Sequence, residues 1–114
     1  MDSRQEARAR LPVEGGQAAG NLGLRAHLAA IVSGDVQGVG FRAFVRQQAR
    51  TLRFAGWVRN LPDGNVALEA EGPQEALQAL AQHLHRGPPG SVVAQVRLVW
   101  SPEQGWGHGF EVIR

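Results

Sequence analysis

Apolar and polar positions alternate with two different periods along the chain, and each change of period marks a new element of secondary structure. Residues 27–34 (HLAAIVSG) form a short apolar run that ends in glycine, which is the pattern of a buried strand. Over residues 41–54 the apolar side chains recur three and four positions apart, as they do on one face of a helix. Gly56 lies just past this segment and is a suitable helix stop.

A turn signal separates the next two apolar segments. The sequence LPDG at residues 61–64 stands between residues 57–60 and the alternating residues 66–71. A strand, a Pro-Asp-Gly turn and a second strand form the pattern of a β-hairpin. A second helix then opens at Pro73, a residue suited to the first helical position, and the sequence GPPG at residues 87–90 ends it.

The remaining apolar segments predict two more strands, at residues 91–100 and 110–113. The predicted order is strand, helix, strand, strand, helix, strand, followed by a short fifth strand. Two βαβ halves joined by a hairpin make the split βαβ, or ferredoxin-like, sandwich (βαββαβ). We therefore expect an α+β fold in which one antiparallel sheet carries both helices on one face, with the last strand at an edge.

The first 26 residues differ in character from the rest of the chain. Residues 1–26 are rich in Arg, Gln, Gly and Ala, and their few apolar side chains are too scattered to form a core face. We expect a disordered N-terminal extension there and a single domain over residues 27–114. The longest apolar runs are far short of a membrane span, and no apolar signal core follows the N-terminal arginines, so we expect a cytoplasmic protein without membrane association.

Composition removes several kinds of chemistry. The chain has no cysteine, which excludes disulfides, thiolate catalysis and cysteine-based zinc or iron–sulfur sites. All 12 basic residues are arginine, so neither a Schiff-base lysine nor a P-loop lysine is available. The pI of 11.0 follows from a net charge of only +2 in a chain without lysine or tyrosine, and it is weak evidence for nucleic-acid binding.

The glycine-rich segment GDVQGVGFR, residues 34–42, joins the first predicted strand to the first predicted helix. Glycine permits positive φ, so successive N–H groups can point into one concavity at the positive end of the helix, where an anion is favoured. Arg42, in the first turn, can add a planar two-pronged donor that matches phosphate oxygens. The segment alone allows two interpretations, a tight turn whose glycines serve packing or a phosphate cradle.

Two nucleotide-binding alternatives fail on their context. Gly38, Gly40 and Ala43 match the G-x-G-x-x-G/A pattern, but that fold continues with further βα units, whereas a hairpin follows here. No Lys-Ser or Lys-Thr follows the glycines, which excludes a P-loop. Asn60, beside the hairpin turn, favours the phosphate cradle because its carboxamide can hold and orient a water molecule. The alternative for Asn60 is a turn residue that makes local hydrogen bonds.

At this point the segments VSGDVQGVGFR, GWVRNLPDGNVALEAEG and GPPGSVVAQV together resemble the acylphosphatase family, over about residues 28–114. The resemblance implies hydrolysis of the carboxyl–phosphate bond of acyl phosphates to a carboxylate and inorganic phosphate, with no metal or other cofactor. It implies that Arg42 is the catalytic, phosphate-binding arginine and that Asn60 positions the nucleophilic water. The amides of the cradle would come from Val36, Gln37, Gly38, Val39, Gly40 and Phe41. The implied partners are a small acyl phosphate substrate and inorganic phosphate as product and inhibitor, and we expect a monomer.

Two features depart from the family pattern, and two other functions compete with it. Asp35 stands where family members usually have a basic or neutral residue, and we expect it to face solvent because a carboxylate repels phosphate. The N-terminal extension is also unusual. One alternative is a binding module on the same fold, an anion sensor or an RNA binder, although the chain has few aromatic residues and no tyrosine to stack bases. The other is a domain of a larger carbamoyl-transfer maturation enzyme, against which a free-standing protein is favoured.

The remaining titratable and aromatic side chains are expected to be structural. Four histidines are expected at surface or turn positions, and the two on the predicted second helix lie two positions apart and face different directions. These are His27, His83, His85 and His108. Glu69 and Glu71 share one face of a strand, which we expect to be the solvent side of the sheet. Trp57 and Trp100 are expected in or near the core.

Overall fold

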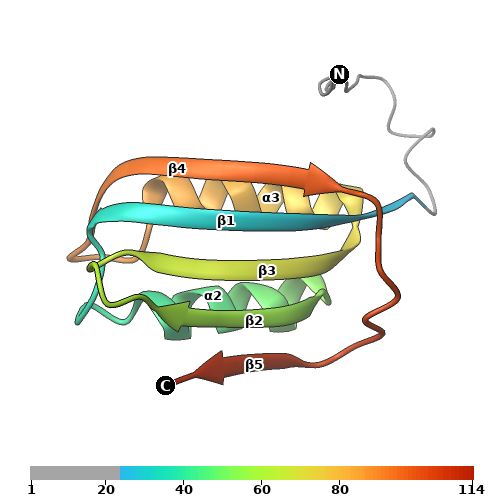
Figure 1. Ribbon diagram of the computed structural model, residues 1–114, viewed down its shortest axis with the longest axis horizontal. Coiled ribbons are helices and arrows are strands. Elements are labelled where there is room, and N and C mark those ends of the chain that lie inside the picture. Colours follow the sequence, from blue (N-terminus) through green and yellow to red (C-terminus); the bar gives the residue numbers. More distant parts are fainter. Residues whose placement is uncertain (1–23) are drawn as a thin grey trace.

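Five strands and two helices follow one another in the predicted order in a computed structural model, which describes residues 24–114 (Figure 1). The strands are β1 (Arg25–Asp35), β2 (Ala55–Asn60), β3 (Val66–Pro73), β4 (Val92–Ser101) and β5 (Phe110–Ile113), and the helices are α2 (Phe41–Leu52) and α3 (Gln74–Arg86). Most of the predicted N-terminal extension, residues 1–23, lies outside the described residues. The first strand begins at Arg25, two residues before its predicted start.

The sheet has the strand order β4-β1-β3-β2-β5, and both helices cover the same face of it (Figure 1). The four strands of the two βαβ halves pair antiparallel, as the ferredoxin-like pattern predicts. The fifth strand departs from the expected antiparallel sheet, because β5 pairs parallel with β2. Its direction follows from the route of the chain. After β4 the chain crosses to the opposite edge without changing ends of the sheet, so β5 starts level with the start of β2.

The core lies between the sheet and the two helices. Alternate residues of the central strands point toward the helices and are buried, which is the period-2 pattern of a sheet with one covered face. Among the most deeply buried side chains are Leu28, Val32, Val58, Leu68, Val45, Leu77, Leu80 and Leu84. Burying each such leucine or valine contributes roughly 1.5–3 kcal/mol, so this layer is the main source of stability for the fold. Neither helix in the described part of the chain is long and apolar enough to cross a membrane.

The ends of the helices differ slightly from the predictions. Helix α2 ends at Leu52, not at residue 54, because Arg53 takes up the left-handed conformation (φ 62°) and its N–H donates to the carbonyl of Ala49. Helix α3 begins one residue after Pro73, and Gly87 follows its last residue as predicted. These caps leave Gly56 inside β2 instead of at the helix stop.

The two tryptophans expected in or near the core lie elsewhere. Trp100 is near the end of edge strand β4 and keeps 41% of its surface exposed, because an edge strand has a neighbour on one side only. Trp57 is half-buried and precedes the buried Val58 in β2, so it points to the face of the sheet that carries no helix. The placement of Trp100 in the core was therefore wrong, and Trp57 packs on the opposite face.

Candidate active site

The glycine-rich loop connects β1 to α2 and presents its backbone at the start of the helix. Gly38 and Gly40 have φ of 76° and 81°, values that side chains other than glycine rarely adopt. Gly40 precedes the first residue of α2, and its carbonyl accepts the first helical hydrogen bond from Phe44 N, at 3.0 Å. No side chain caps this end, and the first turn holds no acidic residue. The positive end of the helix therefore keeps unpaired amides for an external anion.

A pocket of about 260 Å³ opens at this helix end. Its lining residues come from the loop, α2, β2 and β5, and they are Val36, Gly38, Gly40, Phe41, Arg42, Ala43, Arg46, Asn60, Val112 and Arg114. The pocket has room for several water molecules, since each takes about 30 Å³ in the liquid, and so for a phosphate group. Arg42 and Asn60, 18 positions apart in the sequence, line the same pocket.

Arg42 is half-buried in the first turn of α2. Its Nη1 donates a hydrogen bond to the carbonyl oxygen of Ile113 in β5, at 3.1 Å. Within residues 24–114 no carboxylate forms an ion pair with it. A carbonyl fixes the direction of the guanidinium without cancelling its charge, so the full positive charge remains available to a ligand in the pocket.

Asn60 is the last residue of β2 and is half-buried at the pocket. No residue of the described range 24–114 makes a hydrogen bond to its carboxamide. The local turn bonds belong instead to Asn65, whose N–H and Nδ2 donate to the two carboxylate oxygens of Asp63. Asn60 lines the pocket, and the donor and acceptor of its carboxamide are available to a water molecule.

The six residues predicted for the cradle divide into two groups. Val36, Gly38, Gly40 and Phe41 line the pocket, whereas Gln37 and Val39 do not. The Nε2 of Gln37 donates to the carbonyl oxygens of Leu61 and Asn65, both at 2.8 Å. This side chain therefore ties the loop to the β2–β3 turn, and Val39 packs against the core. Asp35 is exposed and does not line the pocket, as expected.

Sequence reasoning missed four residues of the pocket wall. Arg46 follows Arg42 by one helical turn, and the i, i+4 spacing could have identified it. Ala43 lies between them on the same turn. Val112 and Arg114 come from β5 and the residue after it, and only the parallel pairing of β5 with β2 brings them here.

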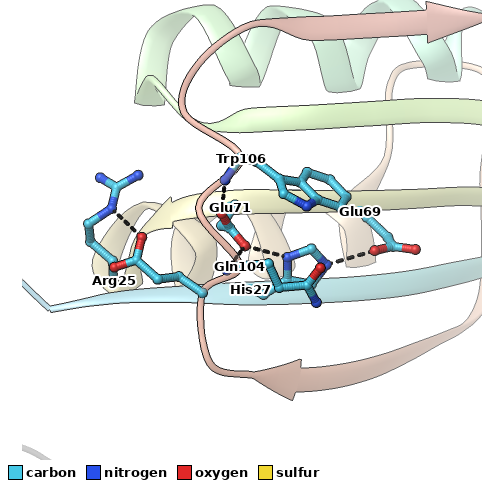
Figure 2. Close-up of polar contacts among 7 residues, drawn as sticks. Arg25, His27, Glu69, Glu71, Gln104 and Trp106 are labelled. Carbon is cyan, nitrogen blue, oxygen red and sulfur yellow. Dashed lines mark hydrogen bonds and ion pairs between the residues drawn. The ribbon is translucent and has the colours of Figure 1, made fainter.

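A buried polar cluster on the helix-free face of the sheet corrects two further expectations (Figure 2). His27 and Glu71 keep only 2% and 1% of their surface exposed. Both were expected at the surface, and both are buried. His27 Nδ1 lies 2.7 Å from Glu71 Oε2, and His27 Nε2 lies 2.7 Å from Glu69 Oε1. The backbone amides of Gln104 and Trp106 donate to Glu71 from the segment that follows β4. That segment passes over the end of the sheet where Glu71 lies, which is why Glu71 is buried.

The charged groups in this cluster shift one another's pKa values. Burial disfavours the cation of His27, but hydrogen bonds to Glu71 and Glu69 and their negative charges outweigh it, so the pKa of His27 is raised above its ordinary 6.5. Burial likewise opposes ionisation of Glu71, but hydrogen bonds from the Trp106 amide, His27 and the Gln104 amide hold the pKa of that carboxyl below its ordinary 4.5. Carboxylate oxygens only accept hydrogen bonds, so the doubly protonated imidazolium satisfies both of its neighbours.

The other histidines are not placed for chemistry. His85 and His108 are exposed, and His83 is half-buried with its ring edge-on to Phe44 at 6.3 Å between centroids. Between residues 24 and 114 no group of three or more His, Asp or Glu side chains is arranged to hold a metal ion. The polar groups among the pocket-lining residues are backbone amides, the guanidinium groups of Arg42, Arg46 and Arg114, and the carboxamide of Asn60.

The sequence of the chain matches a known family. The acylphosphatase family model matches residues 28–112, which is all of the described domain except its ends. The chain belongs to the acylphosphatase family. Acylphosphatases are hydrolases that act on small acyl phosphates, so the function implied by the resemblance is the function of the family.

Individual acylphosphatases are similar over most of their length. The chain is 47% identical over 92 residues to the acylphosphatase of Salinibacter ruber, covering 81% of this chain and 97% of that one. It is 47% identical over 85 residues to the acylphosphatase of Thermus thermophilus, covering 75% of this chain and 96% of that one. The crystal structure of acylphosphatase from Bacillus subtilis superposes with a TM-score of 0.75 at 39% identity, covering 78% of this chain and 99% of that one.

The same fold also occurs inside a larger protein. The crystal structure of HypF from T. kodakarensis matches 79% of this chain with a TM-score of 0.66 and 31% identity, but only 12% of the HypF chain is covered. The acylphosphatases above are instead covered almost completely. The likeness therefore extends to full-length acylphosphatases as well as to one part of HypF.

Proposed function

We propose that this acylphosphatase binds the phosphoryl group of its substrate with Arg42 and the backbone amides of residues 36–41, and that Asn60 orients the attacking water. The observation that supports this most directly is the single pocket lined by Arg42, Asn60 and both glycines of the loop. The pocket combines an uncompensated guanidinium with the positive end of α2, two groups that favour a doubly charged anion.

The substrate itself explains why so few groups suffice. An acyl phosphate is a mixed anhydride, and its leaving group is a carboxylate whose conjugate acid has a pKa of about 4. Such a group departs without being protonated, so no general acid is required. Phosphoryl transfer then depends on positioning and on stabilising the charge of the three equatorial oxygens, which amides and a guanidinium can supply.

The proposed reaction step requires only the substrate, one water molecule and these groups. The oxygen of water attacks phosphorus in line, and the bond between phosphorus and the carboxyl oxygen breaks with its electron pair leaving on the carboxylate. Asn60 accepts a hydrogen bond from this water through Oδ1 or donates one through Nδ2, which holds it opposite the leaving group. The proton of the water passes to a phosphate oxygen of the substrate, which removes the need for a side-chain base.

Several further properties follow from the same site. Inorganic phosphate fits the same cradle as the transferred group, so it is the product and also a competitive inhibitor. The proposed active form is a monomer, since one chain supplies the loop, the arginine and the asparagine that the proposed step requires. We propose a cytoplasmic location, consistent with a cysteine-free chain, and no role in nucleic-acid binding.

Benzoyl phosphate turnover in excess chelator tests the proposal. We expect hydrolysis to persist in chelator, inorganic phosphate to inhibit competitively, and Arg42→Ala to abolish both turnover and phosphate binding. Arg50→Ala is the matched control, because Arg50 is exposed on the same helix and does not line the pocket. Normal phosphate binding by Arg42→Ala would contradict the proposed phosphate cradle. Phosphate binding without turnover by the unaltered protein would indicate an anion sensor instead of an enzyme.

A further inference from the structure

Glu71 is a fully buried carboxylate that lies outside the pocket. Its side chain keeps 1% of its surface exposed, on the face of the sheet opposite the helices. Removing a carboxylate from water is costly unless hydrogen bonds and charges compensate it. Here three donors compensate it, the backbone amides of Gln104 and Trp106 and the ring of His27 (Figure 2). Because two of these donors are backbone amides, Glu71 fixes the position of the segment that contains Gln104 and Trp106.

That segment comprises residues 102–109, here named the crossover segment, and joins β4 at one edge of the sheet to β5 at the other. Glu71 Oε1 accepts from the Trp106 amide at 2.7 Å, and Oε2 accepts from the Gln104 amide. The Trp106 indole stands edge-on to the His27 ring, with 4.5 Å between centroids. Arg25 Nε adds an exposed contact to Glu103 at 3.0 Å. The crossover segment is thus held against β1 and β3 chiefly by one buried carboxylate.

The crossover segment leads directly into β5, a strand of four residues at the edge of the sheet. β5 pairs with β2 only, and the bond from Gly56 N to Gly109 O, 3.0 Å long, extends this pairing into the crossover segment. At the other end of β5, the carbonyl of Ile113 accepts the hydrogen bond from Arg42. The direction of the Arg42 guanidinium therefore depends on a short strand whose start is fixed by the crossover segment.

We propose that Glu71 is a remote positioning residue for the phosphoryl-transfer reaction, an inference that rests on the role proposed above for Arg42. By anchoring the crossover segment, the carboxylate of Glu71 fixes β5 and so keeps the Ile113 carbonyl where it orients Arg42. The chain of contacts runs from Glu71 through the amides of Gln104 and Trp106 to β5, and from Ile113 to the guanidinium. These contacts link the two ends of the sheet along β5. This strand supplies Val112 to the pocket lining and Ile113 to the hydrogen bond with Arg42.

The need for a carboxylate distinguishes this role from simple packing. Each oxygen of Glu71 accepts from a different backbone amide, so both positions need an acceptor. Glutamine has nearly the same shape but presents an NH₂ group to one of those amides, where two donors would meet. Glu69 provides a matched comparison, because it lies on the same face of β3 and contacts His27, while the crossover amides bond to Glu71.

The test compares Glu71→Gln with Glu69→Gln at a temperature at which circular dichroism shows both to be folded. We expect Glu71→Gln to lower kcat/KM for benzoyl phosphate by about tenfold or more and to weaken inhibition by inorganic phosphate, because a misplacement of about 1 Å can cost as much as 100-fold. Glu69→Gln should change both values by less than about twofold. A purely structural carboxylate would lower the melting temperature but leave kcat/KM of the folded protein unchanged, and that result would overturn the proposal.

Hydrogen exchange in the unaltered protein gives a second test, which remains decisive if Glu71→Gln fails to fold. If the crossover segment and β5 open as one unit, the amides of Trp106 and Gly56 exchange with the same opening free energy, since Gly56 N bonds to Gly109. Strong protection of Gly56 beside rapid exchange of Trp106 would mean that β5 holds its place without the anchor. Arg42→Ala separates the two proposals. Normal activity of Glu71→Gln beside an inactive Arg42→Ala refutes the anchor alone, whereas phosphate binding by Arg42→Ala refutes the proposed cradle.

Discussion

The side-chain amide of Gln37 donates to the backbone carbonyl of Leu61 at 2.8 Å and so joins the glycine-rich loop to the turn that follows Asn60. A second bond of the same length, to the carbonyl of Asn65, reaches the other side of that turn. These two bonds hold the glycine-rich loop and the β2–β3 turn, two segments that border the pocket, at a fixed distance from each other. Gln37 does not line the pocket itself, so its effect on catalysis should be indirect.

Replacing Gln37 tests this link. Gln37→Ala removes both bonds, and we expect kcat to fall by about tenfold as Asn60 loses its fixed distance from the loop, since each hydrogen bond contributes roughly 0.5–1.5 kcal/mol. Phosphate affinity should change less than kcat, because the loop amides and Arg42 remain. Gln47→Ala, at an exposed glutamine of α2, serves as the control in steady-state kinetics. Equal kcat values for the two variants would show that the link is dispensable.

Asn60→Ala should separate binding from turnover. The phosphate cradle stays intact without Asn60, so the inhibition constant of inorganic phosphate should change little. Loss of the group that orients water should lower kcat by about 100-fold or more, the scale seen when a single preorganised polar group is removed from an active site. Steady-state kinetics with benzoyl phosphate and phosphate inhibition measure both values. A normal kcat for Asn60→Ala would show that Asn60 does not orient the attacking water.

Gly40→Ala should affect both stability and phosphate binding. Gly40 has φ of 81°, and a Cβ there would meet no atom within 4 Å, so the cost is one of backbone strain, about 1–2 kcal/mol. Relief of that strain would turn the loop amides away from the pocket and weaken phosphate binding. Gly90→Ala is the matched control, because Gly90 has φ of 90° and equally open surroundings away from the pocket. Urea unfolding should give similar losses for both, while phosphate titration should respond to Gly40→Ala alone.

The stability of the fold should depend on pH through His27 and Glu71. The pKa of His27 is raised from 6.5, so its contribution is complete below 6.5 and is lost as the pH rises through the raised value. The pKa of Glu71 is lowered from 4.5, so its contribution is complete above 4.5 and is lost as the pH falls through the lowered value. The pair should therefore stabilise most between these two ordinary values.

Urea unfolding of the unaltered protein and of His27→Gln over a range of pH measures this contribution. The difference in unfolding free energy between them should be largest between pH 4.5 and 6.5 and should shrink above the raised pKa of His27. A difference that does not vary with pH would mean that His27 acts through packing against Trp106 and not through its charge.

Much of the fold and the centre of the site could be predicted from sequence, because both depend on local patterns. Helical and strand periods predicted the order of elements, and the glycines before Arg42 pointed to the loop that lines the pocket. Asn60 followed from its place at the end of a strand beside a recognisable turn. These signals lie within a few residues of the features they predict.

Several of the features that were missed depend on one segment without periodicity, residues 102–109. The alternation along β3 placed Glu69 and Glu71 on the helix-free face, and the usual rule equates such a face with solvent. Residues 102–109 are irregular and glycine-rich, so nothing in their pattern predicted that they would cross this face and bury Glu71. The same crossing sets the parallel pairing of β5 and thus brings Arg114 to the pocket.

The crossing also sets a lower limit on the length of the crossover segment. From β4 to β5 it must span four strand spacings, about 19 Å at roughly 4.8 Å each. The nine steps from Ser101 to Phe110 reach about 31 Å when fully stretched, at roughly 3.4 Å each. Removing four residues would leave five steps, which reach about 17 Å and fall short of that span. The crossover segment therefore has a minimum length, below which β5 could no longer pair with β2.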